Sequence, residues 1–170
     1  MQEFKTSQDA KNKLIISLGD PAGIGTEIIL KALGSKYLNK NIKPLLVGCK
    51  NNIYTTYLKL IKHGITNIPD PNKLEIIDIP LEKKVIPGKV DHYSGSASYK
   101  WLLKATKIIL EGKAHALVTA PISKIAWHKA GHEFSGQTEL LGKLTNKKTS
   151  MLFTAISPNN GWRFNTLLAT

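Results

Sequence analysis

A glycine-rich segment near the N-terminus is the first part of the sequence that could bind a ligand. The segment GDPAGIGTE begins at Gly19, follows a short apolar run and precedes a helical pattern. Unpaired backbone amides at the start of a helix carry partial positive charge, so such a turn can bind an anion. Gly19, Gly23 and Gly25 have no side chain and would let a ligand approach the backbone closely. Asp20 and Glu27 do not suit a bare phosphate; they suit a cation, a polar substrate group or helix capping.

The spacing of these glycines does not identify a ligand. It matches neither the dinucleotide fingerprint G-x-G-x-x-G nor the P-loop G-x-x-x-x-G-K-[ST]. A structural turn, with an acid in the first turn of the following helix, explains the same residues equally well. The residues alone therefore leave a binding loop and a structural turn as open alternatives.

A second group of polar residues follows a later apolar run. Ser123 and Lys124 begin a short helical pattern, and another glycine-rich loop leads to Gln137 and Thr138. Lys124 could pair with an anionic group, while Gln137 and Thr138 could offer an amide and a hydroxyl to a polar substrate. Alternatively, Ser123 and Thr138 cap their helices and the other two side chains lie in solvent.

Two histidines raise the possibility of a metal site. His128 and His132 are four residues apart, the spacing that places two ligands on one face of a helix. However, Gly131 is expected to end that helix, and no H-E-x-x-H motif is present. We therefore expect no metal site from this pair.

Strand and helix patterns alternate along the chain and predict the elements that would position these groups. The expected strands are residues 13–18, 43–48, 74–79, 114–121, 150–156 and 163–170, and the expected helices are residues 26–33, 51–63, 96–110, 123–130 and 138–144. Asn51 or Asn52 should cap the second helix, and the fourth strand should be buried. This order predicts a layered α/β/α fold with a largely parallel sheet, to which a final Asn-Gly hairpin adds an antiparallel element. Both polar groups would then lie at carboxyl ends of strands, where such sheets bind ligands.

Composition narrows the class of protein. The 170 residues carry a net charge of +12, yet Arg163 is the only arginine among 24 basic residues, which weakens the case for nucleic-acid recognition. The pair Lys83-Lys84 suits a solvated loop, and an anionic small molecule is a better partner for part of the charge. No apolar run is long enough to span a membrane, no signal peptide is visible, and Cys49 is the single cysteine. These features indicate a cytoplasmic protein without a membrane or nucleic-acid partner.

Two long segments together resemble a known enzyme family. SLGDPAGIGTEIILKAL (residues 17–33) and VTAPISKIAWHKAGHEFSGQTELL (residues 118–141) look like the N-terminal half of 4-hydroxythreonine-4-phosphate dehydrogenases. The intervening VIPGKVDHYSGSASYKWLLKA (residues 85–105) is similar too. The glycine loop also resembles that of the wider isocitrate and isopropylmalate dehydrogenase-like fold.

The resemblance implies an activity, cofactors and partners. It implies NAD-dependent oxidation of 4-phosphooxy-threonine with decarboxylation, in vitamin B6 synthesis, assisted by a divalent metal and carried out by a homodimer. The family binds substrate through a G-H-T-E segment, which here reads Gly136-Gln137-Thr138-Glu139. Thr138 therefore carries over as a substrate-binding residue, while Gln137 keeps a hydrogen-bonding group and loses a titratable one. The cleft would also include the glycine loop and Lys124, and no histidine of this chain matches a metal ligand of the family.

The resemblance further implies that the chain is incomplete. Residues 1–12 would be a polar tail, and residues 13–170 the N-terminal portion of a two-domain α/β dehydrogenase whose metal ligands lie beyond Thr170. We therefore expect this chain alone to be inactive and to associate through exposed apolar surface. The alternatives are a relative acting on another phosphorylated hydroxy acid, a non-catalytic module that binds anions or nucleotides, and a basic nucleic-acid-binding domain.

Overall fold

The computed structural model describes residues 12–168, which form two compact units. The first unit ends at Glu133 and the second begins at Phe134. The first holds a parallel sheet with its helices, and the second holds a helix and a β-hairpin. Nearly all of the expected polar tail, and the last two residues of the expected final strand, lie outside the described residues. Every helix within the described range is too short or too polar to span a bilayer.

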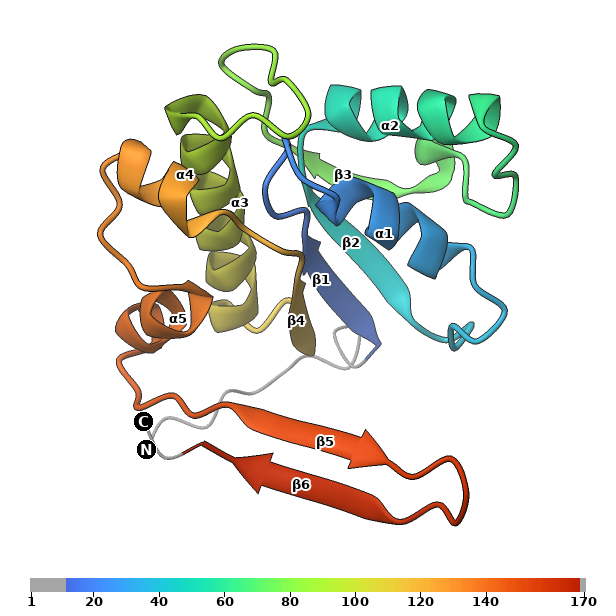
Figure 1. Ribbon diagram of the computed structural model, residues 1–170, viewed down its shortest axis with the longest axis vertical. Helices are drawn as coiled ribbons and strands as arrows, with labels where there is room; N and C mark the ends of the chain where they lie inside the picture. Colours follow the sequence, from blue (N-terminus) through green and yellow to red (C-terminus); the bar gives the residue numbers. More distant parts are fainter. Residues whose placement is uncertain (1–11, 169–170) are drawn as a thin grey trace. The chain divides into compact units, whose positions relative to one another are not determined.

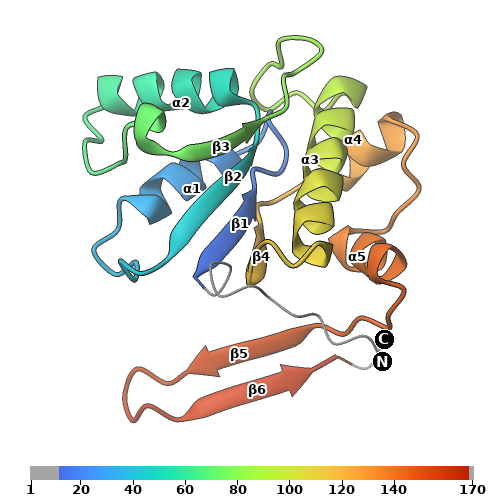
Figure 2. The same ribbon diagram turned by 180° about the vertical axis from the view of Figure 1, so that it is seen from behind.

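A parallel sheet forms the centre of the first unit. Within residues 12–133, β1 (Lys13–Ser17), β2 (Lys43–Gly48), β3 (Glu75–Asp78) and β4 (Ala116–Thr119) pair in the order β3-β2-β1-β4, seen from both sides in Figures 1 and 2. Every pairing is parallel, and Ile15 of β1 lies opposite Leu45 of β2 and Leu117 of β4. The chain advances from β1 to β3 and then returns to place β4 on the other side of β1. The carboxyl ends of β1 and β4 therefore form a topological switch point.

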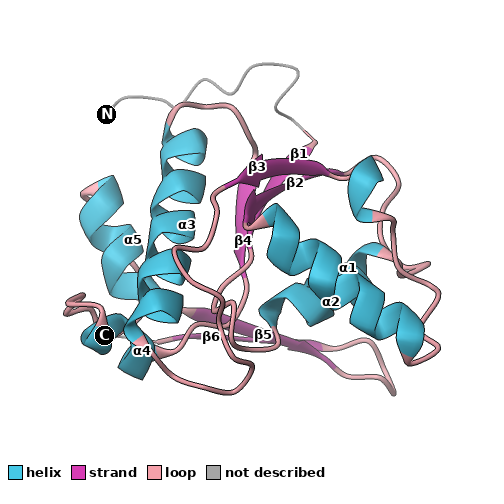
Figure 3. Ribbon diagram, turned by 90° about the horizontal axis from the view of Figure 1, so that it is seen from above, coloured by secondary structure: helices cyan, strands magenta, loops and turns pink. Residues whose placement is uncertain are grey.

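Helices cover both faces of this sheet. Figure 3 shows α1 (Gly25–Leu33) and α2 (Lys50–Lys62) on one face, and α3 (His92–Leu110) on the other with α4 (Lys124–Lys129) beside it. Right-handed crossovers require this division, because the connection through α3 runs in the opposite direction to the first two. A short 3₁₀ turn (Pro71–Lys73) leads into β3. The predicted α/β/α layering with a parallel sheet is confirmed.

The core of the first unit packs the sheet against these helices. The α3 side chains that face the sheet, Ala97, Trp101, Ala105 and Ile108, are buried, and Trp101 is fully enclosed. The indole nitrogen of Trp101 donates to the backbone oxygen of Ile79, 3.1 Å away, so the polar end of the ring is satisfied. Burying a side chain of this size contributes about 2–3 kcal/mol to stability, which fixes α3 against the sheet.

The N-cap of α2 and the start of α3 differ from the prediction, whereas the other helices begin within one residue of it. α2 starts at Lys50 with Cys49 as its N-cap residue, and the Lys50 amide donates to the Asp78 carboxylate at 2.8 Å. The expected capping by Asn51 or Asn52 is wrong, because a carboxylate from the end of β3 already pairs with the first amide. α3 starts at His92, four residues before the predicted Ser96. Asp91 caps it by accepting from the Ser94 amide at 2.9 Å.

The fourth strand is less buried than the sequence predicts. β4 covers only Ala116–Thr119, and the Val118 side chain is 44% exposed. Among the described strands β4 lies at the edge of the sheet, so one side has no neighbouring strand. An apolar run identifies a strand but does not distinguish a central position from an edge.

The second unit contains α5 (Gln137–Thr145), β5 (Leu152–Ile156) and β6 (Arg163–Leu167). Asn146 ends α5 in the left-handed conformation, with φ of 52°. β5 and β6 form the predicted antiparallel hairpin, drawn in orange-red in Figure 1. Within residues 12–168 this hairpin is a separate two-stranded sheet and does not extend the parallel one, contrary to expectation. An Asn-Gly turn specifies only how two strands pair locally and not which sheet they join.

Candidate functional site

The two loops that the sequence singled out in the first unit lie against each other. Gly19 has φ of +71°, and a Cβ atom there would be 2.3 Å from the backbone oxygen of Pro121. The amide of Asp20 donates to that same oxygen at 2.9 Å. The loop after β1 therefore contacts the loop after β4 at the switch point of the sheet. This is the position at which open α/β sheets bind ligands.

The glycines of the first loop have different reasons for being glycine. At Gly25, the first residue of α1, a Cβ atom would lie 2.3 Å from the Leu18 oxygen, so close packing of helix against strand requires glycine. Gly19 is required by its conformation and by Pro121. At Gly23 the nearest atom would be 3.4 Å away, so packing does not require glycine. Gly23 lines a pocket, and it is the loop glycine best explained by approach of a ligand.

Asp20 connects the glycine loop to α3. Its Oδ1 accepts from the Ala22 amide at 2.9 Å, and the Ser94 side chain, at the start of α3, lies near the carboxylate. The residue is buried, and this desolvation raises the pKa of the carboxyl; the hydrogen bond from Ala22 and the Ser94 side chain oppose the shift, and the nearby Asp91 adds to it. These contacts explain an acid in this loop without a ligand.

Glu27 and Lys124 lie near the two loops but are engaged differently. Glu27 pairs with Lys31 one turn along α1, with 2.6 Å between oxygen and nitrogen. Lys124 is the first residue of α4 and is exposed. Ser123 caps this helix, accepting from the Ala126 amide at 3.2 Å, as one of the alternatives predicted. Lys124 thus remains available to an anionic ligand at the carboxyl end of β4.

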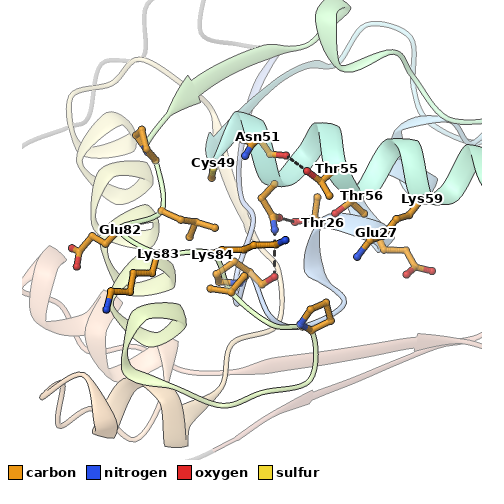
Figure 4. Close-up of a pocket in the computed structure, with 17 residues that line it drawn as sticks. Thr26, Glu27, Cys49, Asn51, Thr55, Thr56, Lys59, Glu82, Lys83 and Lys84 are labelled. Carbon is orange, nitrogen blue, oxygen red and sulfur yellow. Dashed lines mark hydrogen bonds between the residues drawn. The ribbon is translucent and has the colours of Figure 1, made fainter.

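A pocket of about 680 Å³ lies beside the glycine loop, and the sequence did not predict it. Its walls come from the start of α1, the first turns of α2 and the loop that follows β3 (Figure 4). This volume is typical of small-molecule sites. The lining combines apolar residues, neutral polar residues and charged residues: Pro21, Gly23, Thr26, Glu27, Cys49, Asn51, Asn52, Thr55, Thr56, Lys59, Pro80, Leu81, Glu82, Lys83, Lys84, Val85 and Pro87.

Asn52 holds two walls of the pocket together. Its Oδ1 accepts from the Thr26 hydroxyl at 2.9 Å, and its Nδ2 donates to the Pro21 oxygen at 3.5 Å. Instead of capping α2, Asn52 therefore joins α2 to the glycine loop. The Asn-Asn pair just after the second predicted strand was a signal that could have identified it, since that position also lies at a strand's carboxyl end.

In the second unit, Gln137 and Thr138 are the first two residues of α5. The N-cap residue is Gly136, which has no side chain to cap with, so Thr138 is not the cap that one alternative predicted. The Thr138 backbone oxygen accepts from the Thr149 hydroxyl at 3.3 Å, which ties the start of α5 to the segment before β5. Both side chains are half-buried. Their role in substrate binding stays a prediction.

The histidine pair is not arranged as a metal site. α4 ends at Lys129, and the His132 ring stacks on Tyr99 with 3.6 Å between ring centroids. Partial burial lowers the pKa of His132, and the charge of Lys100 lowers it further. Within residues 12–168, no three His, Cys, Asp or Glu side chains are grouped closely enough to hold a metal ion. The described residues therefore do not fit the divalent metal that the resemblance implies, and we derive no step through it.

Comparisons with known proteins agree with this architecture. A curated relative from Synechococcus sp. (strain RCC307), named 4-hydroxythreonine-4-phosphate dehydrogenase, is 50% identical over 159 residues, covering 93% of this chain and 48% of the relative. A D-threonate 4-phosphate dehydrogenase from Pectobacterium atrosepticum is 39% identical, covering 79% and 44%. A solved structure of a 4-hydroxythreonine-4-phosphate dehydrogenase from Klebsiella pneumoniae matches with TM-score 0.70 and 31% identity, covering 86% of this chain and 48% of that one.

These matches establish the family, and they also show how much of it is present. The chain spans about half the length of the curated relatives it matches, 48% in the Synechococcus protein. The sequence profile of the family described as pyridoxal phosphate biosynthetic protein PdxA matches residues 40–169, which is more than half of the chain. The chain therefore belongs to the PdxA family of pyridoxal phosphate biosynthetic proteins.

Proposed function

We propose that this chain is the N-terminal part of an NAD-dependent dehydrogenase that oxidises 4-phosphooxy-threonine in cytoplasmic vitamin B6 synthesis. The observation that carries the proposal is the meeting of the loops after β1 and β4, through Gly19, Asp20 and Pro121. These loops lie within the two segments on which the family resemblance rests. The named relatives support the reaction and the substrate class.

The proposed reaction removes two hydrogens from the substrate as a hydride and a proton. NAD⁺, when bound, would accept a hydride from the carbon that bears the hydroxyl, and the hydroxyl proton would pass to solvent. The resulting 3-keto acid then loses its carboxylate as CO₂. The bound nicotinamide supplies the hydride acceptor, and the protein positions the substrate against it. The divalent metal would be held by the part of the family that this chain does not span.

Within this chain, Thr138 and Gln137 are the proposed substrate-binding residues. The Thr138 hydroxyl can donate to or accept from a substrate oxygen, and the Gln137 amide can do both through separate atoms. Neither side chain titrates near neutral pH, so both bind and orient without transferring a proton. In the first unit, Gly23, with room above its backbone, and the exposed Lys124 are further candidate ligand contacts. The complete enzyme would be a homodimer.

A second substrate has specific support. The Pectobacterium relative is named a D-threonate 4-phosphate dehydrogenase, so a matched protein acts on a different phosphorylated hydroxy acid. Gln137 stands where the 4-hydroxythreonine-4-phosphate dehydrogenases are expected to have histidine. A histidine can be neutral or positively charged, whereas glutamine is always neutral. This exchange would alter how the site recognises the polar end of the substrate. D-threonate 4-phosphate is therefore the second candidate substrate.

A chimaera provides the test. Residues 1–170 would be joined to the C-terminal half of the Synechococcus RCC307 relative, and NADH formation would be measured with each substrate. We expect turnover of at least one substrate, with Gln137→His shifting the preference towards 4-phosphooxy-threonine. The full-length relative is the positive control. The 170-residue chain alone should form no NADH. A folded chimaera that oxidises neither substrate would overturn the proposal.

A further inference from the structure

The pocket beside the glycine loop carries an unbalanced positive charge. Three lysines and two glutamates are among its lining residues. Glu27 pairs with Lys31, and Glu82 pairs with Lys100; neither of these lysines lines the pocket. By contrast, Lys59 and Lys84 form no ion pair with any residue in the described part of the chain. Because the acids are already neutralised from outside, the potential in the pocket favours an anion.

The loop that carries Lys84 is fixed at several points. The Ile79 amide donates to the Gly48 oxygen at 2.9 Å, and the Ile79 oxygen accepts from the ring of Trp101. At the other end of the loop, the Gly88 amide donates to the Ala22 oxygen at 2.8 Å. Val85, between them, is buried. The Lys84 side chain therefore extends from an anchored wall.

The side chains of this loop point in different directions. In Figure 4, Lys84 points into the pocket towards the side where Thr26 lies, whereas Glu82 and Lys83 point out on the other side. Glu82 is held there by Lys100, and the Lys83 ammonium lies 4.8 Å from the centre of the Tyr93 ring. The Glu82 carboxylate therefore points away from the pocket, and the Lys84 side chain points into it.

The pocket is too large for an inorganic anion alone. Its volume of about 680 Å³ holds a ligand with an organic body. An apolar part of the lining, with Pro21, Leu81 and Val85, can contact that body. Neutral polar groups on α2, from Asn51 to Thr56, can accept and donate hydrogen bonds to it. This lining suits a phosphate ester. The anionic group of such a ligand would lie at the lysines, and its larger neutral part would contact the other walls.

We propose that this pocket binds the phosphate-bearing portion of an organic ligand, with Lys84 as the main contact to the phosphate and Lys59 as a second cation. The inference rests on the proposed dehydrogenase only for the source of the phosphate, which is either the dinucleotide cofactor or the phosphorylated substrate. The two sources present the same anionic group to Lys84. They differ in the body attached to it.

Equilibrium binding of ADP-ribose and of 4-phosphooxy-threonine, measured separately by calorimetry on the 170-residue chain and on the chimaera, tests the inference. Lys84→Gln should lower the affinity for one of the two ligands about tenfold, because it removes a charge-assisted contact. Lys84→Arg should keep affinity within about threefold of the original, because it retains the charge. The matched control is Lys89→Gln, which removes the same charge from an exposed position after the pocket loop.

The outcomes separate the inference from the proposed function. A loss confined to ADP-ribose assigns the pocket to the cofactor, and a loss confined to 4-phosphooxy-threonine assigns it to the substrate. Binding of both ligands unaffected by Lys84→Gln, or weakened equally by Lys89→Gln, overturns the inference even if the chimaera forms NADH. Conversely, a selective effect of Lys84→Gln in a chimaera without dehydrogenase activity keeps the pocket and removes the proposed function. If neither ligand binds to the folded chimaera, the inference is also overturned.

Discussion

At the scale of single residues, the buried carboxyl of Asp20 makes stability depend on pH. Its pKa is raised above the ordinary 3.8 mainly by desolvation, so the folded protein holds this proton more tightly than the unfolded chain does. The stabilisation is complete below pH 3.8 and is lost as pH rises through the folded pKa. Asp20→Asn removes this titration. Urea denaturation should show the original protein losing stability relative to Asp20→Asn as pH rises from 3.8 towards neutrality.

A truncation at the same position separates the charge from the hydrogen bonds. Asp20→Ala removes the acceptor for the Ala22 amide, so it should cost about 1–3 kcal/mol below pH 3.8, and this cost should shrink as pH rises because burial disfavours the ionised carboxyl that it also removes. Asp20→Asn retains an oxygen that can accept from Ala22, so it should cost less. A stability difference between the original protein and Asp20→Asn that does not change with pH would contradict the assignment of a raised pKa.

Gly25 provides a second prediction at this scale. An added methyl group would lie 2.3 Å from the Leu18 oxygen, which forces α1 away from the end of β1. Gly25→Ala should therefore lower the free energy of unfolding by about 1–3 kcal/mol, despite the better helix propensity of alanine. Gly23→Ala, with 3.4 Å of space and no positive φ, should change it by less than about 0.5 kcal/mol. Equal effects of the two substitutions in thermal or urea unfolding would refute this distinction.

At the scale of elements, the packing of α3 on α4 depends on one small residue. A Cβ atom at Gly95 would lie 2.0 Å from the Ala126 oxygen, so the two helices approach each other over this glycine. Beside this contact, the Trp127 ring nitrogen donates to the Ser98 hydroxyl at 2.9 Å. Gly95→Ala should separate the helices, weaken this bond and cost about 2–3 kcal/mol.

The neighbouring Ser96 offers the control for that prediction. Ser96 is half-buried and lies on the same helix, and Ser96→Ala slightly favours helix formation. We expect it to change stability by less than about 0.5 kcal/mol. Near-ultraviolet circular dichroism of Trp127 should change with Gly95→Ala and remain unaltered with Ser96→Ala. If the tryptophan signal is unchanged in both variants, the helices are not held together in the described way.

The sequence predicts these elements well where a local pattern determines them. The strand at residues 43–48 matches its prediction, because an apolar run bounded by Gly48 is a local signal. The predicted start of the third helix at residue 96 misses Asp91, although aspartate is a typical N-cap residue. Cap assignment failed at α2 because the carboxylate that pairs with its first amide, Asp78, comes from 28 residues away.

For the candidate site too, the sequence predicts the features that depend on local patterns and misses those that depend on distant residues. The sequence analysis predicted that both loops lie at carboxyl ends of strands, and the structure shows that the loops after β1 and β4 meet there. Nothing local relates Asn52 to Thr26, or Lys84 to the start of α2; the pocket arises only when three parallel strands bring those segments together. The sequence therefore predicts that Lys84 lies in a solvated loop, whereas the structure shows that it lines the pocket.

At the scale of the whole molecule, the hairpin of the second unit exposes large apolar side chains. Phe153 and Phe164 are each more than half exposed, and strand register places both on one face of the hairpin. Trp162 adds to them, 5.8 Å from Phe164 between ring centroids. A two-stranded sheet has little independent stability, and apolar surface of this kind favours contact with other protein surfaces. We therefore expect the 170-residue chain to associate as its concentration rises.

Replacing the two phenylalanines should reduce this association. In Phe153→Thr/Phe164→Thr, threonine keeps strand propensity while the exposed aromatic surface is removed. Sedimentation velocity should show the original chain shifting to larger species with concentration, and the double variant remaining monomeric at several-fold higher concentration. Thr154→Ser lies on the opposite face of β5 and should leave the association unchanged. If the double variant associates as strongly as the original chain, the contact surface lies outside the hairpin. If Thr154→Ser weakens association equally, the effect comes from destabilising the hairpin and not from the aromatic face.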